Sequence, residues 1–204
     1  LIQQSEQQIK THTQHLNEDT TKQLVHYLAA AQNILAIAPS NKKISLDDIQ
    51  IRTELQVGDL PFVIQSHSDL YEKEYNYGKT FDYYVIKGVA EFFEVYDPKR
   101  SRVWVCEHEG QRIGFLSLMD RGEVAQLRYF FMNERYRGIG LGNHLMQLFM
   151  DFLTEKGYQS CYLWTTTEQL AAASLYKKFG FQWVEDMPSN STFDLQVFKD
   201  LNGR

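Results

Sequence analysis

Arg137-Gly138-Ile139-Gly140-Leu141-Gly142 is the stretch on which the fold assignment depends. It joins an extended apolar run, residues 124–132, to an amphipathic helical pattern over residues 141–156. Glycine lets the backbone approach a ligand closely and adopt positive φ. The helix that follows offers unpaired N–H groups and a partial positive charge at its N-terminus, and Arg137 adds a charged hydrogen-bond donor. We therefore expect this junction to hold phosphate groups.

Two other phosphate-binding loops are excluded by the residues that follow. A Walker A loop ends in Gly-Lys-Ser/Thr, whereas this chain continues Gly142-Asn143-His144. A dinucleotide-binding fingerprint has its third glycine one residue later, where Asn143 stands. One alternative stays open at this point, which is a glycine-rich turn between a strand and a helix that binds no ligand.

A second motif follows later in the chain, at Leu175-Tyr176-Lys177-Lys178-Phe179-Gly180-Phe181. It indicates the end of a short helix with a C-terminal glycine, followed directly by a strand over residues 181–184. In this order and at this spacing, the two motifs resemble those of the GNAT superfamily of acyl-CoA-dependent N-acyltransferases. The first is similar to its Arg-x-x-Gly-x-Gly pyrophosphate loop, and the second to its Leu-Tyr-x-x-x-Gly-Phe motif.

The resemblance implies the α+β GNAT fold, in which a central mixed, mostly antiparallel, twisted sheet is flanked by helices. The hydrophobic periodicity along the chain agrees with that fold. Asp59 is expected to cap the first helix of the domain. We expect helices at residues 59–74, 81–96, 141–156 and 168–179, and strands at 49–54, 103–107, 112–119, 124–132 and 158–165, with two more strands at the C-terminal end.

The sequence predicts that the N-terminal part is a separate helical extension. We predict a helical segment over residues 1–41 and the acetyltransferase domain over residues 48–204. Asn17 could cap a second helical stretch, and Pro39 ends the pattern. A helical hairpin that packs on the catalytic domain, or on another copy of itself, is the simplest interpretation of such apolar stripes.

A more specific interpretation comes from a second resemblance. From Ile49 onward the chain resembles the acetyltransferase half of bacterial proteins that fuse a MarR-like winged helix to a GNAT domain. The matching pieces are Ile51-Arg52, Gly58-Asp59-Leu60, His67-Ser68-Asp69-Leu70-Tyr71, Glu74-Tyr75-Asn76-Tyr77 and Leu163-Trp164-Thr165. Residues 1–38 then look like the last dimerisation helices of a MarR domain without its recognition helix. Because the chain begins at Leu1 and not at Met, we expect a trimmed product that reads no DNA here and could form a homodimer.

Composition favours an ordinary soluble enzyme. The 204 residues are 43% hydrophobic, which suffices for a single-domain core, and a net charge of −5 argues against a broad nucleic-acid surface. The apolar stretches fall short of the roughly 20 residues of a membrane helix, and no signal peptide is evident, so we expect a cytoplasmic location. Cys106 and Cys161 are expected to be buried free thiols, and no metal site is expected.

The resemblance implies acetyl-CoA as co-substrate. It assigns the backbone of Phe130, Phe131 and Met132 to the pantetheine arm, with an N–H near Met132 for the oxyanion. Many family members carry Asn where Gln169 stands. The cofactor-binding candidates are Phe130, Phe131, Met132, Arg137, Gly138, Ile139, Gly140, Leu141, Gly142, Gln169, Ala172 and Tyr176.

Acetyl transfer needs an amine beside the thioester, a site for the oxyanion and a proton for the departing thiolate. The resemblance places the Tyr176 hydroxyl beside the CoA sulfur, where a phenol with a pKa of about 10 can protonate the leaving thiolate. Glu74 is the first candidate for the general base and Glu123 the second. His67 is a weaker candidate, because such a histidine is more often a hydrogen-bonded core residue, and a chain of waters is an equal alternative.

The expected acceptor is a primary amine of a small molecule such as an amino acid, and it attacks the thioester directly. In the GNAT fold the first two helices overhang the acceptor side, where Tyr71 and Tyr77 could clamp a small amine. Arg128 stands two residues before Phe130 on the same predicted strand. It could pair with a carboxylate or make a structural ion pair. A protein lysine or an antibiotic stays open as acceptor. A second function also stays open, namely a regulatory module that senses acyl-CoA or a metabolite with weak or no catalysis.

Overall fold

The structure is a computed structural model that describes residues 17, 19–21, 23–24, 27–28, 31, 44–187 and 195–200. Internal contacts divide the chain into two units, Leu1–Lys43 and Ile44–Arg204. In the first unit, Asn17 accepts a hydrogen bond from the backbone N–H of Thr20 at 2.8 Å, which confirms the predicted helix cap. Most of this unit lies outside the described residues, so its division from the rest, its dimerisation and its likeness to MarR stay predictions.

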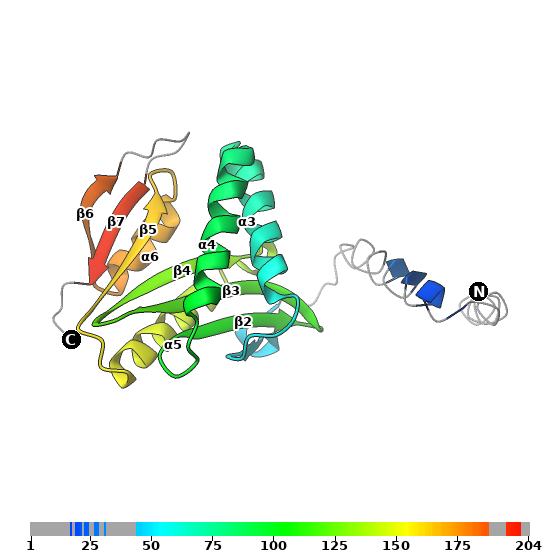
Figure 1. The fold of residues 1–204 in the computed structure, drawn as a ribbon, viewed down its shortest axis with the longest axis horizontal. Helices are drawn as coiled ribbons and strands as arrows, with labels where there is room; N and C mark the ends of the chain where they lie inside the picture. Colours follow the sequence, from blue (N-terminus) through cyan, green and yellow to red (C-terminus); the bar gives the residue numbers. More distant parts are fainter. Residues whose placement is uncertain are drawn as a thin grey trace. The chain divides into compact units, whose positions relative to one another are not determined.

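The second unit is built on a mixed seven-stranded sheet in the order β1-β2-β3-β4-β5-β7-β6 (Figure 1). β4 and β5 pair in parallel, and the other neighbouring strands pair antiparallel. The predicted mixed, mostly antiparallel sheet is confirmed. The strands are β1 (Gln50–Arg52), β2 (Arg102–His108), β3 (Gln111–Arg121), β4 (Val124–Met132), β5 (Ser160–Thr166), β6 (Phe181–Met187) and β7 (Leu195–Asp200).

Helices cover both faces of this sheet (Figure 1). α3 (Asp59–Tyr75) and α4 (Lys79–Val95) pack on one face, and α5 (Leu141–Glu155) and α6 (Leu170–Lys178) pack on the other. Short 3-10 turns, η1 (Leu46–Asp48) and η2 (Glu134–Tyr136), precede β1 and follow β4. Because both faces are covered, the central strand β3 is buried almost continuously from Ile113 to Met119. No helix in the described part of the chain has the length and apolar character to cross a membrane.

Asp59 does not cap α3, contrary to the prediction. The cap is Gly58, whose φ is +91°, and Asp59 is the first residue of the helix. Its fully buried carboxylate accepts hydrogen bonds from Arg52 at 2.6 Å and from Arg112 at 2.7 Å. Burial opposes ionisation, but the bonds from Arg52, the Gln56 backbone and Arg112 outweigh it and hold the pKa of Asp59 below its usual range. This carboxylate therefore ties α3 to β1 and β3.

β4 is the strand that positions the site. It pairs with β5 only through residues 124–127, opposite Ser160–Leu163, although β4 continues to Met132 and β5 to Thr166. Beyond Leu127 the two strands diverge (Figure 1). Within the described residues, no strand therefore pairs with the β5 side of residues 130–132, and the backbone groups there are available to a ligand.

A bulge in β4 breaks the alternation expected from the sequence. The register with β3 shifts between Phe115 and Ser117, and Tyr129 has a φ of +55°. Tyr129 belongs to the core cluster under α3 and α4, whereas Phe130 packs against the opposite cluster. Arg128 lies on the α4 side of β4, where its Nη1 is 3.6 Å from Oε2 of Glu91.

Candidate active site

The loop between β4 and α5 has the conformation of an anion-binding helix start. Gly138 and Gly140 have φ values of +80° and +93°, which side chains rarely adopt. Gly140 is the N-cap of α5, and no side chain caps the first turn. The N–H groups of that turn are thus free of a side-chain acceptor, and the helix dipole favours an anion beside them.

A cavity of about 580 Å³ opens beside this loop; we call it the loop-side cavity. The last turns of α3, the free end of β4, the glycine loop and α6 form its walls. Ile139 and Leu141 are absent from its lining because their side chains pack into the core. The structure brings together the other cofactor candidates there, namely Phe130, Phe131, Met132, Arg137, Gly138, Gly140, Gly142, Gln169, Ala172 and Tyr176.

Glu74, the first candidate for the base, also lines the loop-side cavity. Its Oε1 atom accepts a hydrogen bond from Nη2 of Arg137 at 2.6 Å. The carboxylate is therefore paired with the guanidinium of the loop. Glu123 lies in the turn before β4, at the opposite end of the strand from the loop, and lines neither this cavity nor the next one.

A second, smaller cavity of about 70 Å³ lies where β4 and β5 diverge, under α3 and α4; we call it the inner cavity. Tyr71 and Arg128, two of the three predicted acceptor residues, line it. Tyr77 does not: it is buried beside the cavity and donates a hydrogen bond to Oε2 of Glu168 at 3.0 Å. Glu168 in turn lines the loop-side cavity.

Tyr176 lies at the junction of the two cavities and lines both, as do Phe130 and Gln169. Burial among aromatic rings raises the pKa of Tyr176 above its usual range, so the hydroxyl keeps its proton at neutral pH. Gln169 is held by the Thr165 hydroxyl, which donates to Oε1 at 2.6 Å. A protonated phenol is thus held between the large cavity beside the glycine loop and the small inner cavity.

His67 is a hydrogen-bonded core residue. Its Nδ1 donates to the carbonyl oxygen of Val63 at 2.8 Å, and the ring packs edge-on against Tyr129 and Phe131. Burial lowers the pKa of His67 to about 4, and the nearby charge of Arg128 acts in the same direction. His67 is therefore neutral at pH 7.

A model of the acetyltransferase (GNAT) family matches residues 64–181, more than half of the chain. The chain belongs to this family. Acetyl-CoA is the acyl donor of GNAT acetyltransferases, which confirms the predicted co-substrate for the family. The free edge of β4, the uncapped start of α5 and the adjoining large cavity fit such a molecule.

Curated relatives of this GNAT protein resemble it over part of their length. It is 30% identical over 125 residues to the uncharacterised N-acetyltransferase MJ1207 of Methanocaldococcus jannaschii, covering 56% of this chain and 54% of the relative. It is 29% identical over 99 residues to the uncharacterised N-acetyltransferase YjgM of Escherichia coli, covering 47% and 59%. The match to N-acetylaspartate synthetase of Xenopus tropicalis is 33% over 86 residues, covering 41% and 32%. The chain thus spans about half the length of the first two relatives.

Solved structures share the fold of this GNAT protein. An acetyltransferase from Streptococcus agalactiae superposes with a TM-score of 0.61 at 17% identity, over 76% of this chain and 99% of that one. A GNAT family acetyltransferase from Elizabethkingia anophelis with acetyl-CoA bound gives 0.53 at 14% identity, over 75% and 97%. The predicted fold class is confirmed.

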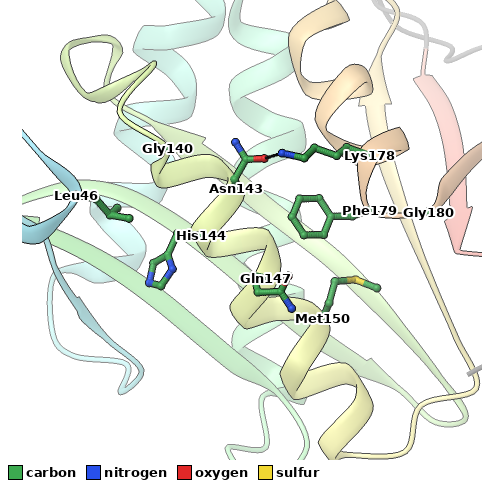
Figure 2. A pocket seen from close by; sticks show the side chains of 9 residues that line it. All are labelled: Leu46, Gly140, Asn143, His144, Gln147, Met150, Lys178, Phe179 and Gly180. Atoms are coloured by element: carbon green, nitrogen blue, oxygen red, sulfur yellow. Dashed lines mark hydrogen bonds between the residues drawn. The ribbon is translucent and has the colours of Figure 1, made fainter.

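A hollow on the far side of the glycine loop runs along α5 (Figure 2). Asn143 and His144 lie on the first turn of α5, and Lys178 reaches across from the end of α6 to donate to Oδ1 of Asn143 at 2.5 Å. The hollow meets the loop at Gly140. It therefore offers polar side chains to any part of a ligand that extends beyond the loop.

Sequence reasoning missed Gln126 and Tyr129, which line the inner cavity. Gln126 gave a readable signal, because it is a polar residue inside the apolar run of β4. Tyr129 gave no such signal, because the direction of its side chain depends on the bulge in β4. Both residues bear on what the inner cavity can bind.

Proposed function

We propose that this protein transfers the acetyl group of acetyl-CoA to the primary amine of a small molecule. The observation that carries the proposal is the position of Tyr176 at the junction of the two cavities. A thioester in the loop-side cavity and an amine in the inner cavity would meet beside its hydroxyl. Proximity of this kind supplies a large part of the acceleration in acyl transfer.

The loop-side cavity would hold the cofactor through backbone groups. Phosphates would accept hydrogen bonds from the N–H groups after Gly138 and Gly140, assisted by the α5 dipole. The amides of the pantetheine arm would pair with the free edge of residues 130–132 as an added strand does. An N–H near Met132 would stabilise the oxyanion of the tetrahedral intermediate.

In the reaction, the amine nitrogen attacks the thioester carbonyl carbon, the C–S bond breaks, and the thiolate takes the proton of Tyr176. The raised pKa of Tyr176 keeps the phenol protonated before the transfer and favours recovery of a proton afterwards, and it also makes the phenol a weaker acid toward the thiolate. The amine must lose its own proton. Glu74 could accept it once a phosphate competes for Arg137 and frees the carboxylate, and a relay of waters is the alternative.

The acceptor class rests on two observations. One relative is named for the synthesis of N-acetylaspartate, and Arg128 in the inner cavity is a suitable partner for an acidic group. Both favour an amino acid or similar metabolite over a protein lysine.

The test combines calorimetric titration of acetyl-CoA with measurement of free thiol across a panel of amino acids and amines. The proposal expects saturable binding and thiol release that depends on the acceptor. Binding without thiol release for any acceptor would contradict catalysis and favour a metabolite-sensing module. Absence of binding would contradict the assignment of the loop.

A further inference from the structure

The inner cavity contains hydrogen-bonding groups that the fold leaves unused. Among the residues that the structure describes, Nε2 of Gln126, Oη of Tyr129 and Oγ1 of Thr166 are buried without a hydrogen-bond partner. Gln126 is 1% exposed and Tyr129 is 9% exposed, and both line this cavity. Leaving such groups unsatisfied is costly, and because all three line this one small cavity they point to a ligand.

The orientation of the Gln126 amide follows from its neighbour. Nε and Nη2 of Arg121 lie 3.1 and 2.9 Å from Oε1 of Gln126. A guanidinium can only donate hydrogen bonds, so the atom that faces Arg121 has to be the amide oxygen. The amide nitrogen is thereby fixed as a free donor.

Arg128 adds a buried positive charge whose N–H donors are available to a ligand. It is 8% exposed, and its Nη1 lies 3.6 Å from Oε2 of Glu91, beyond hydrogen-bond distance. The other oxygen of Glu91 is 2.7 Å from Arg121, and this carboxylate is half exposed. The two arginines therefore share one carboxylate, and His67 beside them is neutral. The cavity carries an excess of positive charge.

α4 is shaped to admit these groups. A Cβ atom at Gly88 would lie 2.5 Å from Nη2 of Arg128 and 2.8 Å from Oη of Tyr129. Glycine inside a helix costs stability, and here it makes the room that both side chains occupy. The bulge of β4 brings these two consecutive residues to the same side of the strand, with the guanidinium 4.9 Å from the Tyr129 ring.

We infer that the inner cavity binds the carboxylate of the acceptor through Arg128, the amide nitrogen of Gln126 and the hydroxyl of Tyr129. A carboxylate is planar, accepts bidentate bonds from a guanidinium, and has lone pairs for two further donors. The cavity volume of about 70 Å³ suits an end group and not a whole metabolite. The inference rests on the proposed function and names its substrate class as amino acids whose amine points to Tyr176.

The test compares acceptors that differ only in the carboxylate. Phenylalanine, methionine and lysine are each paired with the amine that lacks the α-carboxylate, and kcat/KM is measured for both members. We expect the amino acid to exceed its amine by about tenfold or more, the effect of a charge-assisted hydrogen bond. Equal values within the pairs, or a preference for amines that carry a phosphate monoester, would overturn the inference while the acetyltransferase activity stands.

Gln126→Glu is the decisive variant. It keeps an oxygen toward Arg121 but replaces the free donor by an acceptor with negative charge. The ratio of kcat/KM between amino acid and amine should fall by about tenfold, whereas Gln182→Glu, the same change on the exposed strand β6, should leave it unaltered. An unchanged ratio in Gln126→Glu would overturn the inference.

A binding readout separates this inference from catalysis. Calorimetry with N-acetylphenylalanine and N-acetylmethionine should detect binding to the CoA-bound protein that is weakened about tenfold in Gln126→Glu. Such binding without turnover of any amine would uphold the carboxylate site and contradict the proposed function. Tyr129→Phe removes an unsatisfied buried hydroxyl, so it should fold at least as stably as the parent and still bind these acids more weakly.

Discussion

Nη2 of Arg137 lies 2.6 Å from Oε1 of Glu74, so the glycine loop is tied to the last turn of α3. The arginine that is expected to meet a pyrophosphate and the carboxylate that is expected to take a proton are thus each other's partners. A phosphate bound at the loop would compete with Glu74 for the guanidinium. The proposed function therefore predicts that cofactor binding and release of the base are coupled through this one contact.

Glu74→Gln tests that coupling. Loss of the competing carboxylate should tighten acetyl-CoA binding by up to about fivefold, the range of a partly exposed ion pair. Loss of the base should lower kcat by about a hundredfold. Calorimetry and steady-state rates measure the two effects separately. An unchanged kcat would mean that a chain of waters, and not Glu74, accepts the proton of the amine. An unchanged affinity would mean that the ion pair between Glu74 and Arg137 persists with the cofactor bound.

Gly140→Val tests the loop. The φ of +93° is strained for valine, although no atom lies within 4 Å of the added Cβ. The domain should therefore still fold, but the loop should change its conformation. Acetyl-CoA affinity should then fall by more than about tenfold, because the N–H groups lose their alignment. Gly122→Val in the turn between β3 and β4 is the matched control, since its φ is +89° and its surroundings are equally open. Retained affinity in Gly140→Val would refute the loop as the phosphate site.

His67 should make the fold sensitive to acid. Burial lowers its pKa from 6.5 to about 4, so between these values the unfolded chain binds a proton that the folded chain does not. Stability therefore falls as the pH drops through this window, by on the order of 3 kcal/mol once the pH is below 4. His67→Phe should lose this dependence, as measured by urea unfolding between pH 7 and 4, and the exposed His144→Gln should keep it. An identical pH dependence in His67→Phe would contradict the assignment.

Local patterns in the sequence predicted the strands, the helices and the glycine loop, and the resemblance to the GNAT superfamily supplied the mixed sheet in which the strands are arranged. Gly140 sits in a motif whose neighbours along the chain determine its conformation, whereas the placement of Tyr176 beside the CoA sulfur came from the resemblance and stays a prediction. The role of Asp59 could not be predicted, because the local pattern suggested a helix cap. Its partners Arg52 and Arg112 lie on β1 and β3, and only the tertiary structure brings them to it. Likewise Arg128 and Tyr129 share a face only because β4 bulges, and the partner of Glu74 lies 63 positions away.

The most direct test of the account is Tyr176→Phe, measured for acetyl-CoA affinity and for turnover with the best amine. The general-acid role predicts that kcat falls by about a hundredfold while the dissociation constant for acetyl-CoA stays within about twofold. A kcat equal to that of the parent protein, or a loss of cofactor binding without a change in kcat, would contradict the placement of Tyr176 at the reacting bond.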